Sequence, residues 1–153
     1  LIEIGFIMRG EIIWQKSKGA NANFAWGSWL SASNPVIRDI HEYCLVFSKD
    51  SLKKPSQGES SIEKEEFMES TLSIWNIHPA RAKKIGHPAP FPIELPQKFI
   101  NLYTYKNDLV LDPFLGSGTT AVAAKLLERN FVGYEIEEKY IAIANRRLKK
   151  EVN

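Results

Sequence analysis

The alternation of apolar and polar positions is most regular between residues 109 and 136, where it predicts a strand, a loop, a helix and a second strand. Residues 109–111 are a short apolar run, and residues 131–134 form another. Between them, small and apolar residues recur on one face of the predicted helix over 119–127, which suits close packing on a sheet. Because strands joined through a helix pair in parallel, this part of the chain predicts an α/β fold.

A carboxylate follows each predicted strand directly. Asp112 follows the first strand and Glu135 the second, so parallel pairing would place both at the same edge of the sheet. The turn Gly116-Ser117-Gly118 lets a ligand lie against the backbone, because neither glycine carries a Cβ. Thr119 and Thr120 are expected to cap the helix that follows. Two acids that flank a glycine turn suit the hydroxyls and amines of a nucleoside.

What the turn lacks narrows the choice of nucleotide. No lysine follows Gly118, which argues against a triphosphate-binding P-loop, and the third glycine of dinucleotide folds is missing. Asp112 would repel a pyrophosphate but attract an ammonium group. S-adenosylmethionine carries both an ammonium group and a ribose, so it matches the two acids. Two alternatives are a glycine turn in an ordinary βαβ unit and an oxidoreductase that binds a nicotinamide dinucleotide.

The segment Asp112–Thr120, Asp-Pro-Phe-Leu-Gly-Ser-Gly-Thr-Thr, resembles the cofactor motif of DNA methyltransferases that modify the exocyclic amine of adenine (N6) or cytosine (N4). The position of this motif near the end of the chain resembles their β class. The resemblance implies that Asp112 faces the methionine amino group, that Glu135 binds the ribose hydroxyls and that Ile136 lies near the adenine. The cofactor-binding residues implied here are Asp112, Pro113, Phe114, Gly116, Ser117, Gly118, Thr119, Glu135 and Ile136.

A proline-rich segment precedes this motif. His87–Pro92 and Glu94–Pro96 resemble the family segment that closes over the methionine end of the cofactor, which implies that His87 and Pro88 bind it. Alternating prolines favour an extended chain, and a proline suits the first turn of a helix predicted over 97–105. The alternative is a rigid linker. The His-Pro form departs from the Lys-Pro form of many adenine enzymes, which favours cytosine N4 without excluding adenine N6.

The resemblance covers nearly all of the 153 residues. It implies a methyltransferase domain fragment with a Rossmann-like, three-layer α/β fold and a mostly parallel sheet, incomplete at the N-terminus. Residues 1–50 would hold two strands of the catalytic side. Residues 51–86 would be a polar region that either recognises the target or is a solvated loop. Residues 87–153 would bind the cofactor, and a helix over 138–150 would cover the sheet.

The family's catalytic tetrapeptide, Asp/Ser/Asn-Pro-Pro-aromatic, is absent from the sequence. In the family, its polar side chain and a carbonyl hold the target amine while its aromatic ring stacks on the flipped base. In the β class this motif would lie before Leu1. The chain is therefore expected to be the C-terminal part of a longer enzyme that, alone, does not methylate DNA. The alternative is a non-catalytic subunit that binds S-adenosylmethionine or DNA and completes a split enzyme.

The net charge of +2 is too small to identify a nucleic-acid partner, so local clusters carry the DNA prediction. Arg81, Lys83 and Lys84 precede the proline-rich segment and are expected to contact phosphates. Trp26 and Asn23 lie in a glycine-containing stretch. Such side chains either stack on and hydrogen-bond a base or cover a sheet edge.

Composition adds a few expectations. No apolar run approaches the roughly 20 residues of a membrane span. The single cysteine, Cys44, excludes an internal disulfide, fits a reducing cytoplasm and is expected to be buried. No histidine or cysteine pair has metal-ligand spacing, so no metal is expected. Basic residues at 146–150 are expected to form a solvated helix end. An incomplete sheet has unpaired edges, which would permit a homodimer by strand pairing.

Overall fold

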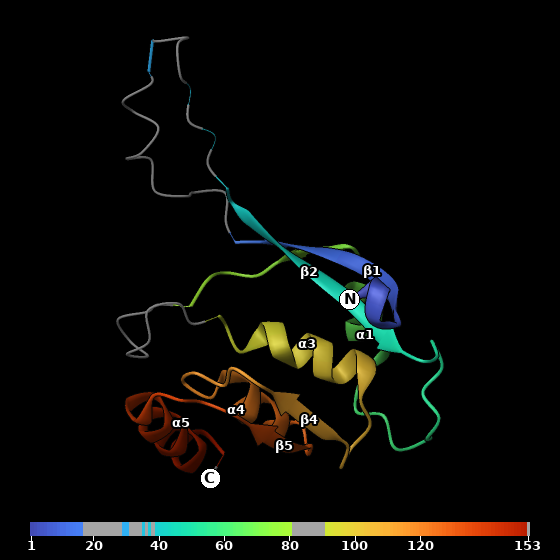
Figure 1. Ribbon diagram of the computed structural model, residues 1–153, viewed down its shortest axis with the longest axis vertical. Helices are drawn as coiled ribbons and strands as arrows, with labels where there is room; N and C mark the ends of the chain where they lie inside the picture. The colour runs from blue at the N-terminus through green and yellow to red at the C-terminus, as the bar shows by residue number, and fades with distance from the viewer. Residues whose placement is uncertain (17–28, 31–34, 36, 38, 81–90, 153) are drawn as a thin grey trace. The chain divides into compact units, whose positions relative to one another are not determined.

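The computed structural model describes the chain except for residues 17–28, 31–34, 36, 38, 81–90 and 153 (Figure 1). The chain divides into two compact units. Unit 1 comprises Leu1–Lys53 and Leu72–His78, and unit 2 comprises Lys54–Thr71 and Pro79–Asn153. Among the described residues, no helix has the length and apolar character needed to cross a membrane.

Unit 1 is built on a three-stranded sheet in the order β2-β1-β3. β1 spans Phe6–Gln15, β2 spans His41–Lys49 and β3 spans Ile74–Asn76, and a short 3-10 helix over Ile2–Ile4 precedes β1. β1 pairs antiparallel with β2 and parallel with β3. Both strands predicted in this part of the sequence are therefore present, and the sheet of unit 1 is mixed.

Two tryptophans form the centre of the unit 1 core. Trp14 and Trp75 are register partners on neighbouring strands, and both are buried. The indole Nε1 of Trp14 donates a hydrogen bond to the carbonyl oxygen of Ile77 at 2.8 Å, which satisfies its polar atom inside the core. Ile77, the residue after β3, is buried as well, so the core extends past the end of that strand.

Cys44 lies on β2 and is only partly buried, so the prediction of a buried thiol is wrong in degree. The reason is that, among the described strands, β2 lies at the edge of the sheet and pairs with β1 alone. Burial still raises the pKa of the Cys44 thiol, and the charge of Glu42 raises it further. A raised pKa disfavours the thiolate, the form in which a cysteine acts as a nucleophile.

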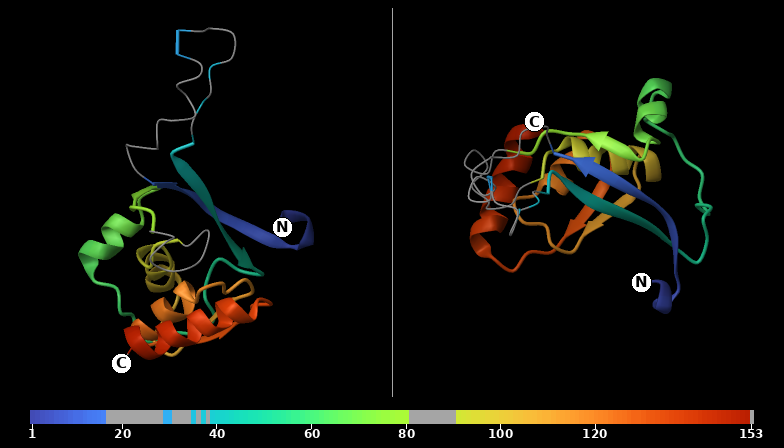
Figure 2. Two further views of the ribbon diagram at one scale, coloured as in Figure 1. Left: turned by 90° about the vertical axis from the view of Figure 1, so that its left-hand side faces the viewer. Right: turned by 90° about the horizontal axis from the view of Figure 1, so that it is seen from above.

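Unit 2 contains the predicted strand, loop, helix and strand. β4 and β5 pair in parallel, with Asp112 opposite Gly133. α3 and α5 both contact α4, and both views of Figure 2 show α5, in red, beside the orange β4–α4–β5 segment. The elements of the unit are α1 (Lys64–Ser70), α3 (Glu94–Tyr103), β4 (Leu109–Asp112), α4 (Thr119–Leu126), β5 (Asn130–Gly133) and α5 (Glu138–Glu151).

The small side chains of α4 make it the buried helix of unit 2. All four residues from Ala121 to Ala124 are fully buried. Ile100 of α3 belongs to the same core cluster, and Val110 of β4 and Phe131 of β5 pack against it. The face of α4 that was predicted to pack is buried. The buried surface extends farther around the helix than predicted, because α3 and α5 also contact it. Alanine permits this close approach on several sides.

Two details of the helix ends differ from the predictions. α3 begins at Glu94, three residues before the expected start, and ends at Tyr103. Pro96 is tolerated inside its first turn because the N–H group that proline lacks has no intrahelical partner there. α4 has Gly118 at its N-cap in the left-handed conformation, with no side-chain cap. The prediction that Thr119 and Thr120 cap this helix is therefore wrong.

A buried arginine ties the polar segment before α1 to the rest of unit 2. Arg129 donates from Nε to the Thr104 hydroxyl at 2.9 Å and from a terminal nitrogen to the Ser61 hydroxyl at 2.6 Å. The Ser61 hydroxyl donates to Asn101 Oδ1 at 3.0 Å, and Asn101 Nδ2 donates to Glu66 at 2.9 Å. Burial lowers the pKa of the Arg129 guanidinium. Part of the region expected to be a polar loop is therefore anchored by hydrogen bonds.

Candidate cofactor site

The loop after β4 is interlocked with the end of β5. The Tyr134 amide donates to the Asp112 carbonyl oxygen at 3.0 Å, and the Leu115 amide donates to the Tyr134 carbonyl oxygen at 2.8 Å. These bonds continue the parallel ladder one step beyond the paired strands. They place the two predicted acids, Asp112 and Glu135, at the carboxyl ends of neighbouring strands, as the sequence indicated.

Three backbone N–H groups hold the carboxylate of Glu135. Its Oε2 accepts a hydrogen bond from the Gly116 amide at 2.8 Å. Its Oε1 accepts from the amides of Ile136 and Glu137, each at 2.9 Å. Both oxygens are thus oriented by backbone groups, and a carboxylate oxygen can accept more than one hydrogen bond. Glu135 is a preorganised acceptor that is joined directly to the glycine turn.

Asp112 is oriented by the loop that it precedes. Its Oδ1 accepts a hydrogen bond from the Phe114 amide at 3.0 Å, which is the local side-chain-to-backbone bond typical of aspartate in a turn. The carboxylate is half-buried at the start of the loop. A fixed negative charge at this place favours a positively charged ligand group.

The glycine turn has a conformation that most side chains would oppose. Gly116 and Gly118 have φ values of 53° and 80°. A Cβ on Gly118 would lie 2.7 Å from the Cβ of Ala144 in α5, so the turn packs directly on that helix. Residues 116–119 are buried, whereas Phe114 and Ile136 are 86% and 94% exposed. The described residues of the predicted cofactor set therefore comprise a buried turn, two held acids and three exposed apolar residues, Pro113, Phe114 and Ile136.

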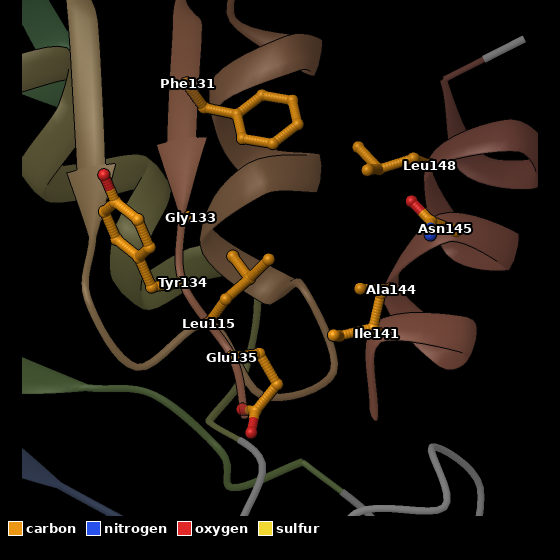
Figure 3. A pocket seen from close by; sticks show the side chains of 9 residues that line it. All are labelled: Leu115, Phe131, Gly133, Tyr134, Glu135, Ile141, Ala144, Asn145 and Leu148. Carbon is orange, nitrogen blue, oxygen red and sulfur yellow. The ribbon is translucent and has the colours of Figure 1, made fainter. Parts of the chain in front are cut away.

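A pocket of about 290 Å³ opens beside Glu135. In Figure 3, Leu115 and Phe131 point toward α5, Ile141 and Leu148 point back from it, and Glu135 lies at one end. Its lining is mostly apolar apart from Glu135 and Asn145. The pocket is lined by Leu115, Phe131, Gly133, Tyr134, Glu135, Ile141, Ala144, Asn145 and Leu148.

One contact to the turn comes from a residue that the sequence analysis placed elsewhere. Arg147, expected in a solvated helix end, donates hydrogen bonds to the Ser117 carbonyl oxygen at 3.0 Å and to the Thr119 hydroxyl at 2.9 Å. The Thr119 hydroxyl, expected to cap α4, is an acceptor for this side chain. The sequence held one signal for this contact. Ala144 and Arg147 are three residues apart, so they lie on the same face of the helix, and an arginine on an apolar face indicates a buried polar partner.

Several predicted site residues lie outside the described part of the chain. They are His87 and Pro88 for the cofactor, and Arg81, Lys83, Lys84, Trp26 and Asn23 for DNA. In the part that the structure describes, no group of three or more histidine, cysteine, aspartate and glutamate side chains could hold a metal ion.

Comparisons with known proteins match this chain to a family. The model of the N6/N4 DNA methylase family matches residues 1–146. The type II methyltransferase M.BglI of Bacillus subtilis is 38% identical over 147 residues, which are 94% of this chain and 39% of that protein. The type II methyltransferase M.MjaI of Methanocaldococcus jannaschii is 34% identical over 169 residues, which are 99% of this chain and 54% of that protein.

A solved structure agrees with these relatives. TTHA0409 from Thermus thermophilus, complexed with S-adenosyl-L-methionine, superimposes with a TM-score of 0.78 at 30% identity. The match covers 99% of this chain and 56% of that one. The chain thus spans about half the length of the relatives it matches, and it shares their Rossmann-like α/β fold. By the family model and by these identities, the chain belongs to the N6/N4 DNA methylase family.

Proposed function

We propose that this chain supplies the S-adenosylmethionine-binding half of a DNA methyltransferase that transfers a methyl group to an exocyclic amine of cytosine (N4) or adenine (N6). The observation that carries the proposal is the pair of oriented carboxylates, Asp112 and Glu135, at neighbouring strand ends. The 2.8 Å hydrogen bond from Gly116 to Glu135 joins one of them to the glycine turn. The family of the chain and the ligand named for TTHA0409 support the same cofactor.

The chemistry of the two acids supports specific roles. Glu135, held by three amides, would accept hydrogen bonds from the ribose hydroxyls through both oxygens. Asp112 would pair with the methionine ammonium, which a pyrophosphate-containing dinucleotide does not offer. The remaining predicted cofactor residues would contribute backbone and apolar surface around these two. S-adenosylmethionine would supply the activated methyl group, and the residues of this chain would bind and orient the cofactor.

The catalytic tetrapeptide of the family is not found in these 153 residues. We therefore propose that the chain alone does not methylate DNA and that the transfer needs residues which it does not contain. The division into catalytic-side strands over 1–50, a recognition or loop region over 51–86 and a cofactor half over 87–153 belongs to this proposal. The form of the proline-rich segment favours cytosine N4 over adenine N6.

The proposed DNA contacts are Arg81, Lys83, Lys84, Trp26 and Asn23. The positive charges of Arg81, Lys83 and Lys84 suit phosphates. The aromatic ring of Trp26 and the amide of Asn23 suit bases. We also propose a cytoplasmic location, which the single cysteine and a DNA substrate support. The second candidate function is a subunit that completes a split methyltransferase, and it rests on the same missing tetrapeptide. A homodimer formed through sheet edges is a further proposal, which the molar mass from light scattering tests.

The proposal is tested by calorimetric titration of the chain with S-adenosylhomocysteine, with NAD as the control ligand. We expect binding of S-adenosylhomocysteine alone, and its loss in Asp112→Ala and in Glu135→Ala. Glu138→Gln, a change of charge at an exposed carboxylate in the first turn of α5, is the matched control and should bind normally. Silence from this chain and from a longer polypeptide that carries the tetrapeptide would contradict the proposal.

The activity is tested separately with DNA and labelled S-adenosylmethionine. We expect no methylated adenine or cytosine with the chain alone and transfer with the longer polypeptide. Mass spectrometry of the digested DNA then distinguishes N4-methylcytosine from N6-methyladenine. Methyl transfer by the chain alone would contradict the proposed division of labour.

A further inference from the structure

One guanidinium bridges the end of α5 and the glycine turn. Arg147 donates from Nε and from a terminal nitrogen to the carboxylate of Glu151, at 3.0 and 3.4 Å. Its other terminal nitrogen donates to the Ser117 carbonyl oxygen at 3.0 Å and to the Thr119 hydroxyl at 2.9 Å. The Arg147 side chain is only 14% exposed. One edge of the planar guanidinium thus binds the Glu151 carboxylate, and its other terminal nitrogen binds the glycine turn.

The contact to Ser117 fixes a whole peptide group. The Ser117 carbonyl and the Gly118 N–H belong to one plane because the peptide bond is rigid. The carbonyl accepts from Arg147, and the Gly118 amide donates to the Leu115 carbonyl oxygen at 2.9 Å. This plane is therefore held at both ends, in a turn whose glycines could otherwise adopt many conformations.

A second peptide group, between Leu115 and Gly116, connects this plane to Glu135, the proposed ribose-binding acid. The Leu115 carbonyl and the Gly116 N–H share a plane, and the Gly116 amide donates to Glu135 Oε2 at 2.8 Å. Arg147 is therefore connected to the Glu135 carboxylate through two rigid planes and three hydrogen bonds. If the Arg147 contact is lost, both planes can rotate, and the amide that orients Glu135 rotates with them.

A second, independent contact makes α5 the support of the turn. A Cβ on Gly118 would lie 2.7 Å from the Cβ and 3.0 Å from the Cα of Ala144. Ala144, Arg147 and Glu151 are spaced by three and four residues, so they lie along one face of α5. The turn therefore rests on the helix at Ala144 and is hydrogen-bonded to it at Arg147. Neither contact depends on a ligand.

We propose that Arg147 is a positioning residue of the cofactor site, which sets the geometry of the glycine turn and, through it, the orientation of Glu135. The inference rests on the proposed function, in which Glu135 binds the ribose of S-adenosylmethionine. By this inference α5 contributes to cofactor affinity through Arg147. Arg147 and Glu135 are the two ends of the chain of hydrogen bonds that runs through the turn. Lysine cannot reproduce this, because an ammonium lacks the fork that binds the acid and the turn together.

The test compares Arg147→Gln, Arg147→Lys and the control Arg146→Gln, which removes the same charge from the exposed neighbouring residue. Titration with S-adenosylhomocysteine should show affinity about tenfold weaker in Arg147→Gln, the factor that corresponds to about 1.4 kcal/mol. Arg147→Lys should lose less, because its ammonium can still donate to the Ser117 carbonyl oxygen. Arg146→Gln should bind as the unsubstituted chain does.

Amide hydrogen exchange, followed by NMR without ligand, separates positioning from general loosening. In Arg147→Gln the amides of Gly116 and Gly118 should exchange faster. The Asn130 amide, bonded to Asp108 at the other end of β5, should not change. Equal acceleration at Asn130 would mean general destabilisation and would overturn the inference, as would unchanged exchange at Gly116 and Gly118.

The two readouts distinguish failure of the inference from failure of the proposed function. If the unsubstituted chain binds S-adenosylhomocysteine but Arg147→Gln binds it equally well, the inference alone is wrong. If neither the unsubstituted chain nor a longer polypeptide that carries the tetrapeptide binds S-adenosylhomocysteine, the proposed function is wrong. The exchange rates of Gly116 and Gly118 then still decide whether Arg147 positions the turn.

Discussion

Replacing Glu135 by glutamine should damage the site more than the similar shape of the two side chains suggests. Both carboxylate oxygens accept backbone N–H groups, one from Gly116 and the other from Ile136 and Glu137. A glutamine has one accepting oxygen and one NH₂ group. Whichever way the amide turns, its NH₂ faces at least one backbone N–H, so a hydrogen bond is replaced by a repulsive contact.

The magnitude follows from these bonds. Hydrogen bonds to a charged group contribute about 1.5–3 kcal/mol, against about 0.5–1.5 kcal/mol for neutral pairs. Because Glu135 is half-buried, we expect Glu135→Gln to lower the free energy of unfolding of unit 2 by about 1–3 kcal/mol. The affinity for S-adenosylhomocysteine should fall by roughly 10-fold to 150-fold, since a charged acceptor of the ribose is also lost.

Urea denaturation and calorimetric titration measure the two effects. Glu135→Ala is the informative comparison, because water can reach the three amides once the side chain is removed. Glu135→Gln should therefore be at least as destabilising as Glu135→Ala. Glu138→Gln should stay within about 0.5 kcal/mol of the unsubstituted chain. Glutamine at 135 with normal stability and normal affinity would refute the reasoning that the carboxylate is held by opposed donors.

Three further predictions concern the framework of unit 2. Gly118→Ala should lower the free energy of unfolding by about 2 kcal/mol or more, because φ is positive and the new methyl meets Ala144; a loss below about 0.5 kcal/mol in urea denaturation would contradict this. Arg129→Met should cost about 3 kcal/mol and expose the segment before α1 to proteolysis, since buried acceptors lose their donor; an unchanged cleavage pattern would contradict it. Burial would raise the pKa of Asp108, but the hydrogen bond and charge of Lys54 and a backbone amide outweigh burial and lower it. Ionised Asp108 therefore stabilises the fold above its unfolded pKa, and this contribution, under about 1 kcal/mol for so exposed a pair, is lost as the pH falls through the lowered pKa. Lys54→Met should flatten the acid limb of a plot of thermal stability against pH, and an unchanged limb would count against the pair.

The local pattern around β4 and β5 carried enough information to predict this part of the fold. Two short apolar runs, a glycine turn and an alanine-rich helix left few other arrangements. The positions of Asp112 and Glu135 followed from the parallel pairing, because the carboxyl ends of parallel strands share one edge. The hydrogen bond between Gly116 and Glu135 did not follow, since it depends on how the loop is folded over the end of β5.

Contacts between distant positions were the part that the sequence could not supply. Arg147 was assigned to a solvated helix end because its neighbours in sequence are basic, whereas its location depends on the packing of α5 against the turn. Arg129 gave no periodic signal, and its partners Ser61 and Thr104 lie 68 and 25 residues away. The prediction that Thr119 caps α4 was wrong because Gly118, with a positive φ, occupies the N-cap position.

The most direct test of the central claim is a crystal structure of the chain with S-adenosylhomocysteine bound. The account predicts both ribose hydroxyls within hydrogen-bonding distance of the Glu135 carboxylate and the amino group of the ligand beside Asp112. The Gly116 amide should still donate to Glu135. A ligand bound away from the two acids, or a Glu135 side chain that turns away from the turn to admit it, would contradict the account.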